Sequence, residues 1–121
     1  MISIKDKEIL RNLAKTQKEY ANSLENLELT DLWTKHNTLR GERPMICIEV
    51  ESFEQEVIHP LLLCEDSQAR QIECELYRNI VHRKYFNDDF PVPPYFPINV
   101  WGYFKLFFTV CIVNKPIFVF V

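Results

Sequence analysis

The side chains that could bind a metal ion or act as a nucleophile are the 3 histidines and 4 cysteines of this chain. In order, they are His36, Cys47, His59, Cys64, Cys74, His82 and Cys111. A zinc site needs three or four such ligands in tetrahedral reach, usually with one tight pair, and the sequence has no C-x-x-C pair. A Cys–His nucleophile would need the two side chains in direct contact, which the spacing does not indicate. We therefore predict that these residues are structural and that the chain binds no metal ion or other cofactor.

Two carboxylates, Glu49 and Glu51, are the other candidates for chemistry, because they lie at the end of a strand predicted at residues 45–50. Side chains two residues apart lie on the same face of a strand, and like charges this close can raise the pKa of one of them. Such pairs are typical of catalytic groups at the ends of barrel strands. A solvated strand end, with Arg43 free to pair with either carboxylate, explains the same residues, and we prefer it. The sequence thus predicts no catalytic residue.

The composition excludes several classes of partner. The chain has 121 residues, enough for one domain, and its hydrophobic fraction of 47% allows a core. The net charge of −3 gives no clustered positive charge for nucleic acid or anionic lipid. The 2 glycines cannot form a Gly-rich phosphate loop. The irregular cysteine spacing and the lack of an apolar leader after Met1 predict a cytoplasmic protein with reduced thiols.

Helical periodicity and capping residues predict most of the secondary structure. The predicted helices cover residues 4–21, 24–39, 51–58 and 67–86. Ser3 and Asp6 resemble a capping box before the first helix, and Asp66 or the serine after it can cap the last. Within the second helical stripe, Thr30–Asp31 can divide the helix into two short ones. Gly41 is placed to end the second predicted helix by adopting a positive φ.

One strand is predicted in the first 90 residues, over 45–50, where an apolar and β-branched run lies between Pro44 and several acids. Such a run is typical of a strand buried on both faces, as in a parallel sheet. Its backbone needs neighbouring strands on both sides, and the sequence before residue 90 offers none. A turn at 87–89 and an extended, proline-rich stretch at 91–97 follow. The predicted fold class is α+β and mostly helical, with an incomplete sheet.

The chain divides near residue 90 into two kinds of sequence. All 17 acidic residues lie at or before Asp89, whereas Lys105 and Lys115 are the only charged residues from Phe90 onward. The nearly uncharged run from Leu106 to the end is too short and too interrupted for a good membrane span. It is rich in β-prone residues, which predicts self-association or a protein partner.

Six segments occur in an order that is similar to a known family. They are Leu39–Ile46, Phe53–Ile58, Cys64–Asp66, Glu75–Asn79, Val92–Pro97 and Tyr103–Phe107. Together they resemble the N-terminal part of uroporphyrinogen decarboxylase-like proteins, and most closely the branch related to cobalamin-dependent methyltransferases. The resemblance covers about residues 1–107. It implies a (β/α)8 barrel preceded by helices, to which this chain would contribute the helices and the first one or two strands.

The chemistry that the resemblance implies lies largely outside these residues. Full-length relatives act on corrinoid or porphyrin substrates, and the methyltransferase branch binds zinc through His and Cys ligands in later parts of the barrel. The arginine-rich substrate motif of the decarboxylases is not matched, because Glu49–Ser52 stands in its place. The first interpretation is therefore a truncated N-terminal fragment, a barrel fragment with no activity alone.

Residues 108–121 lie beyond the resemblance and form a second predicted region, an aberrant apolar tail. Their loss of acidic residues and their excess of Phe, Ile and Val are typical of a prematurely ended or frame-shifted reading frame. An alternative interpretation belongs to another class of protein. It is a small helical protein–protein interaction module that docks through its apolar C-terminus.

Overall fold

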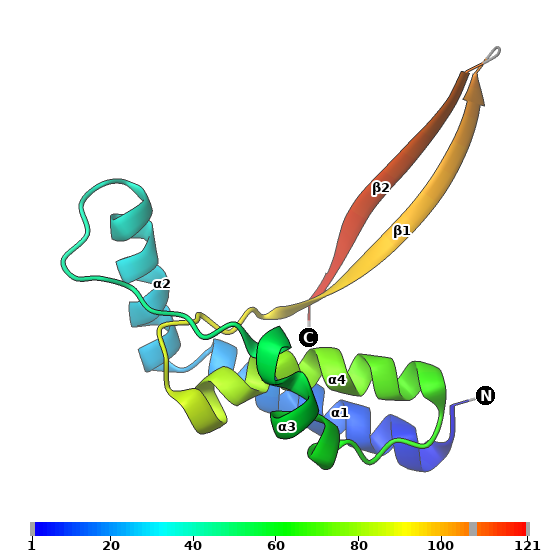
Figure 1. Cartoon of the computed structure of the whole chain (residues 1–121), viewed down its shortest axis with the longest axis horizontal. Coiled ribbons are helices and arrows are strands. Elements are labelled where there is room, and N and C mark those ends of the chain that lie inside the picture. The colour runs from blue at the N-terminus through cyan, green and yellow to red at the C-terminus, as the bar shows by residue number, and fades with distance from the viewer. Residues whose placement is uncertain (1, 107–108, 121) are drawn as a thin grey trace.

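The computed structural model describes the backbone of residues 2–106 and 109–120, and the side-chain surroundings of residues 2–97. A helical body, residues 2–94, is followed by a two-stranded ribbon that projects away from it (Figure 1). The body contains α1 (Ile4–Ala21), α2 (Leu24–Asn37), the 3-10 turn η1 (Val50–Phe53), α3 (Glu54–Val57), the 3-10 turn η2 (His59–Leu61), α4 (Ser67–Val81) and the π-helical turn η3 (His82–Phe86). The ribbon consists of β1 (Tyr95–Leu106) and β2 (Thr109–Phe120). The prediction of a mostly helical chain is confirmed.

Side-chain caps begin α1, α2 and α4. The hydroxyls of Ser3 and Ser23 each accept the amide three positions later, at 3.0 and 3.2 Å. One carboxylate oxygen of Asp66 accepts two amides of the first turn of α4. These caps satisfy amides that have no partner inside the helix. The helices predicted at 4–21 and 67–86 are confirmed, with the last turn of the second in π-helical form.

The helix α2 is continuous, so the division predicted at Thr30–Asp31 is wrong. The hydroxyls of Thr30 and Thr34 each donate to the carbonyl four residues earlier, at 2.9 Å. Because these hydroxyls are satisfied within the helix, they do not compete with its backbone pairing.

The end of α2 also differs from the prediction. Leu39, and not Gly41, adopts the left-handed conformation, with φ of 60°. The Leu39 amide donates to the carbonyl of His36 at 3.1 Å, and the Arg40 amide donates to that of Lys35 at 2.8 Å. This is the Schellman pattern, which closes the helix two residues before the glycine.

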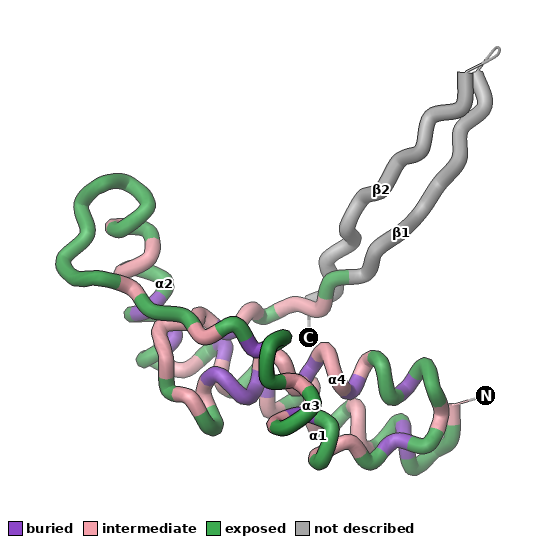
Figure 2. Tube along the Cα trace, viewed as in Figure 1, coloured by how far each residue is buried: buried purple, intermediate pink, exposed green. Residues whose placement is uncertain are grey.

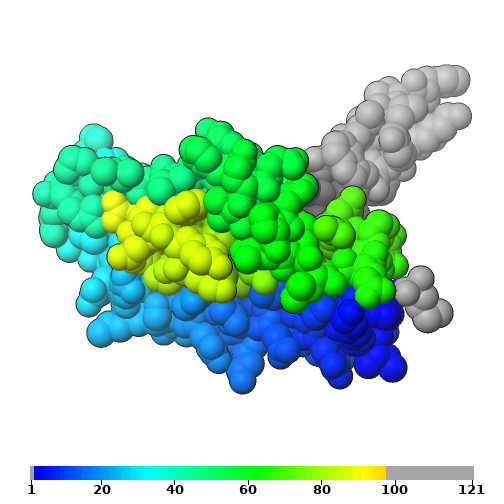
Figure 3. Space-filling model, turned by 60° about the horizontal axis from the view of Figure 1, so that its bottom comes forward, coloured from blue at the N-terminus to red at the C-terminus, as the bar shows by residue number. Residues whose placement is uncertain are grey.

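The core lies along α4, which packs beside α1 (Figure 2). Val50, Ile58 and Val81 form a buried cluster, so η1 and the end of α3 are held against α4. The buried residues of α1 are mainly polar, and they include Asp6 and Gln17. Figure 3 shows the chain after α4 lying between α1 and the segment that precedes α4. The body therefore combines an apolar cluster with buried polar contacts.

The segment at residues 45–49 is extended but is not a strand, so the strand predicted at 45–50 is wrong. Its side chains are not buried on two faces, since Ile46 is 66% exposed. The amides of Ile46 and Ile48 donate to the carboxylates of Asp89 and Asp88, at 2.8 and 2.7 Å. The Asp89 amide donates to the Ile46 carbonyl at 2.8 Å. Side chains thus supply the hydrogen bonds that we expected from neighbouring strands.

The ribbon is an antiparallel pair in regular register from Tyr95 opposite Phe120 to Leu106 opposite Thr109. It extends from the end of the proline-rich stretch (Figure 1). Across the backbone that the structure describes, β1 and β2 pair only with each other. The outer edge of each strand therefore carries amide and carbonyl groups that a further strand could pair with.

Candidate functional site

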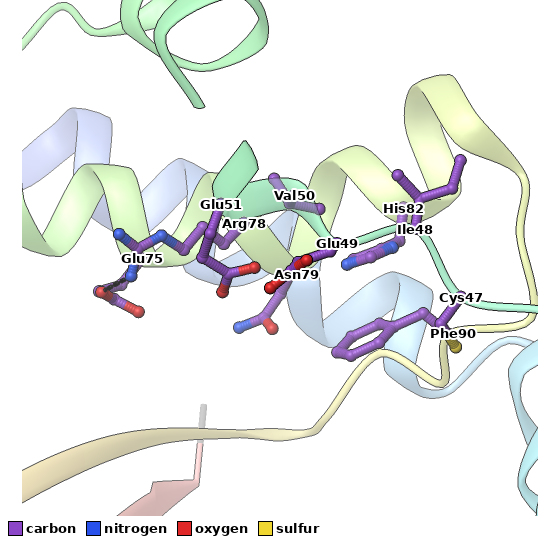
Figure 4. Close-up of a pocket in the computed structure, with 10 residues that line it drawn as sticks. All are labelled: Cys47, Ile48, Glu49, Val50, Glu51, Glu75, Arg78, Asn79, His82 and Phe90. Carbon is purple, nitrogen blue, oxygen red and sulfur yellow. Dashed lines mark hydrogen bonds and ion pairs between the residues drawn. The ribbon is translucent and has the colours of Figure 1, made fainter. Parts of the chain in front are cut away.

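A pocket of about 330 Å³ lies beside α4 (Figure 4). One wall is the segment before and including η1, another is α4, and Phe90 closes a third side. The lining residues are Cys47, Ile48, Glu49, Val50, Glu51, Glu75, Arg78, Asn79, His82 and Phe90. Both carboxylates that the sequence analysis selected are among them, together with a histidine and an arginine.

His82 is the most deeply buried titratable group of this pocket. Its side chain is 6% exposed, and its Nδ1 lies 2.9 Å from a carboxylate oxygen of Asp88, whose side chain is 4% exposed. The imidazole ring stacks on the ring of Phe90, with centroids 3.9 Å apart and planes at 15°. Because a carboxylate only accepts hydrogen bonds, Nδ1 donates its N–H to Asp88. The contact fixes both the orientation and the tautomer of His82.

Asp88 and Asp89 position the wall formed by residues 45–49. Asp88 accepts the Ile48 amide in addition to the His82 contact. Asp89 accepts the Ile46 amide and a bidentate pair of hydrogen bonds from Arg43, at 2.6 and 2.8 Å. The Arg43 guanidinium and the Ile46 amide lower the pKa of Asp89 to about 2. The wall is therefore fixed to the turn after α4 by two carboxylates, those of Asp88 and Asp89.

Arg78 lines the pocket beside Glu75 but is already paired. Its guanidinium donates to Glu54 at 2.8 and 2.5 Å and also contacts Glu75. The Arg78 guanidinium holds the pKa of Glu54 below its usual value. A second hollow of about 600 Å³, between α4 and the base of β1, shares Glu75 and Arg78 with this pocket. Because two acids already pair with it, Arg78 carries little positive charge into either space.

Glu49 and Glu51 both face the pocket, but their setting differs from the one predicted. They are exposed, and they follow an extended loop instead of a buried strand. Arg43 pairs with Asp89 and with neither glutamate, so the ion pair considered for it is wrong. Within the described part of the chain, no residue forms an ion pair or hydrogen bond with either carboxylate. The pocket therefore has two uncompensated negative charges at its rim.

The remaining candidate residues are dispersed. Burial raises the pKa of the Cys64 thiol to about 12 and that of Cys74 to about 11, so both are held as thiols. His59 lies 3.5 Å from Glu54, and His36 makes an edge contact with Trp33. Among residues 2–97, no three His, Cys, Asp or Glu side chains gather where they could hold a metal ion. The side chain of Cys111 lies outside the described residues.

The carboxylates that organise the site were not predicted as such from the sequence. Residues 87–89 were predicted to form a turn, and Asp88 and Asp89 in addition bind the 45–49 segment. Asp6 and Glu73 have the same role for the loop before α4, where each accepts two amides. For Asp88 and Asp89 the only signal in the sequence was their position after the last helical turn, where an acid does not complement the helix dipole. Which distant amide it binds depends on the tertiary fold.

Comparisons of the chain with known protein families, with curated proteins and with solved structures find no match. The resemblance carried by the six segments named above therefore stays a prediction. Within the described residues, no helix combines the length and the apolar character that a membrane crossing requires.

Proposed function

We propose that this chain is a docking unit without catalysis of its own, the helical lead-in of a uroporphyrinogen decarboxylase-like or corrinoid methyltransferase-like protein. The observation that carries the proposal is the position of β1. This strand ends at Leu106, close to residue 107 where the resemblance ends. The body before it is held by its own hydrogen bonds, including those that join Gln17 and Asn26 to the chain around the start of β1. In this proposal β1 joins the helices to a larger sheet.

The backbone of the ribbon supports this role. β1 has 12 residues and one paired edge, so its other edge is a template for a further strand. An isolated two-stranded hairpin is marginal in water, and more strands or a covering helix stabilise it. The ribbon sequence, with Lys105 and Lys115 as its only charges, suits a sheet that is covered on both faces. We infer that β2 occupies the edge that a barrel strand takes in full-length relatives.

Catalysis in this proposal belongs to residues outside the chain. Active sites of (β/α)8 barrels are assembled from the ends of several strands. The resemblance places zinc ligands in later parts of the barrel, and Glu49–Ser52 replaces the arginine-rich motif of the decarboxylases. We expect the chain alone to turn over neither a porphyrin nor a methylated corrinoid.

The genomic DNA beyond codon 107 tests the proposal directly. We expect a barrel-like sequence downstream in one of the three forward frames. If no frame contains one, the proposal is wrong. Turnover of porphyrin or methylated corrinoid by the purified chain would also contradict it, and retention of that turnover after deletion of residues 108–121 would identify a stand-alone enzyme.

A small interaction module is the second candidate, because the buried polar groups of the body are largely satisfied without any partner. Solution behaviour distinguishes the two. A lead-in whose strand belongs in a larger sheet should self-associate and bind a hydrophobic dye strongly. A module should be monodisperse, bind little dye and unfold in one cooperative transition.

A further inference from the structure

The pocket on α4 combines three features that the docking role does not use. The first is the oriented His82, whose Nδ1 is bound to Asp88. The contacts of the described residues give its other ring nitrogen, Nε2, no hydrogen-bond partner. Figure 4 shows the His82 ring reaching into the pocket beside Glu49 and over Phe90. In the neutral ring that donates from Nδ1 to Asp88, Nε2 presents a lone pair, so the group offered to a ligand is a hydrogen-bond acceptor.

The second feature is uncompensated negative charge. Three carboxylates line the pocket, those of Glu49, Glu51 and Glu75, against one cation, Arg78. Arg78 is paired with Glu54 and Glu75, which leaves the first two carboxylates without a partner among the described residues. A recess with acidic walls concentrates cations and repels anions. The ligand therefore carries positive charge.

The third feature is shape. The ring of Phe90 forms a flat side of the pocket, already stacked on His82. Flat cations that carry N–H groups pair with carboxylates through parallel hydrogen bonds and also contact aromatic rings favourably. A volume of about 330 Å³ is at the lower end of small-molecule sites, which suits one such group.

We propose that this pocket binds a small planar nitrogen cation, an amidinium or guanidinium. One N–H is donated to Nε2 of His82, and the charge is balanced by Glu49 and Glu51. Binding involves no bond making or breaking. The proposal does not depend on the ribbon, because every residue in it belongs to the helical body.

The test is a titration of the full chain with benzamidinium chloride, with neutral benzamide at the same ionic strength as the control. The observed signals are the ring C–H resonances of the three histidines. We expect benzamidinium to shift the His82 resonance saturably and to leave those of His36 and His59 unchanged. Benzamide should shift none of them. Equal effects of the two compounds, equal shifts of all three histidines, or no saturable shift would each overturn the proposal.

Variants identify the carboxylates without disturbing the buried histidine. The double substitution of Glu49→Gln and Glu51→Gln should weaken benzamidinium binding about tenfold or more, because both balancing charges are lost. Glu56→Gln, on the exposed surface of α3, is the matched control and should change the affinity less than twofold. If the double variant binds as tightly as the parent, the assignment is wrong.

Two further probes distinguish the source of the cation. Methylguanidinium represents a free small molecule, and N-acetyl-arginine amide represents an arginine side chain of a protein. Tighter binding of the second probe would support a protein arginine as the ligand, and equal binding would support a free cation. Binding of neither probe would contradict the guanidinium class. A failure of the barrel prediction would leave these results unchanged, so the two proposals fail separately.

Discussion

In the helical body, the backbone between helices is paired with polar side chains, whereas in the ribbon each strand is paired with one neighbouring strand. Both regions contain extended chain, and both must satisfy its amides and carbonyls. The body does so with polar groups from its helices and from the turn after α4. The ribbon does so along one edge per strand. The helical body therefore satisfies its irregular backbone from within, whereas each strand of the ribbon keeps one edge on which a further strand could pair.

Three irregular segments of the body show how side chains satisfy its backbone hydrogen bonds. The loop before α4 is bound by Asp6 and Glu73, the chain leading into β1 by Gln17 and Asn26, and the 45–49 segment by Asp88 and Asp89. Burial alone would raise the pKa of Asp6, but the amides of the loop outweigh it and lower that pKa. Removing a buried partner leaves the amide unsatisfied, which costs more than the bond contributes. Substitutions of these side chains therefore test whether the body holds its irregular segments in this way.

The largest effect is expected at Glu73, which is fully buried and accepts the amides of Leu63 and Cys64 at 2.8 and 2.9 Å. Glu73→Ala should lower the free energy of unfolding by roughly 3 kcal/mol, because two amides lose their partner. Urea unfolding followed by helical circular dichroism measures the change. Glu28→Ala, at an exposed position of α2, is the control and should cost less than about 0.5 kcal/mol. Similar losses in the two variants would mean that the loop is not held in this way.

A smaller effect is expected at Asn26, whose amide group bonds the chain that leads into the ribbon. It accepts the Val92 amide at 2.7 Å and donates to the carbonyls of Val92 and Ala21. Asn26→Ala should cost about 2 kcal/mol and speed hydrogen exchange at the Val92 amide. Asn12→Ala, on the exposed side of α1, is the control. Unchanged exchange at Val92 would show that the connection between body and ribbon does not depend on Asn26.

The parts of this fold that follow from local sequence were predictable, and the parts that follow from tertiary contacts were not. The capped, periodic helices α1 and α4 lie where their residues place them. The run at 45–50 has the composition of a buried strand, yet Asp88 and Asp89 pair with its amides and leave Ile46 exposed. The composition of a segment indicates how well it suits a β-sheet. It does not indicate whether carboxylates far along the chain will accept hydrogen bonds from its amides in place of a neighbouring strand.

The candidate site shows the same division. Glu49 and Glu51 were selected because they follow an apolar run, and they do line the pocket, although the run is not a strand. His82 was named only as one of several possible metal ligands. Its importance comes from Asp88, six residues later, across a π-helical turn that no helical periodicity indicates. The left-handed Asn87, with φ of 48°, directs the chain back so that the two side chains meet.

Acid should loosen the 45–49 segment through Asp89. The pKa of Asp89 is about 2 in the folded chain, because of Arg43 and the Ile46 amide, against about 3.9 in an unfolded chain. The unfolded state binds the proton first, so this stability is fully present above about pH 5 and is lost as the pH falls towards 2. Since Arg43 is 45% exposed, we expect about 1 to 2 kcal/mol.

Unfolding measurements between pH 6 and pH 2.5 check this expectation about Asp89. Asp89→Asn should remove most of the acid-induced loss of stability between about pH 5 and pH 2. Asp31 forms an exposed ion pair with Lys35, so Asp31→Asn should show the same pH dependence of stability as the parent chain. The same acid dependence in the parent and in Asp89→Asn would assign the loss to other carboxylates. The segment would then be held chiefly by Asp88, whose side chain is 4% exposed.

Deleting residues 108–121 should have the smallest effect on the body and the most direct bearing on the comparison. The deletion removes the partner of β1, but the hydrogen bonds described for residues 2–97 join the body to itself and to the first residue of β1. We expect the helical circular dichroism to be retained and the free energy of unfolding of the body to change by less than about 0.5 kcal/mol. A loss of several kcal/mol would mean that the ribbon packs into the body's core. In that case β1 and β2 would belong to one cooperative unit with the helices, and the open edge of β1 could not be treated as a separate docking element.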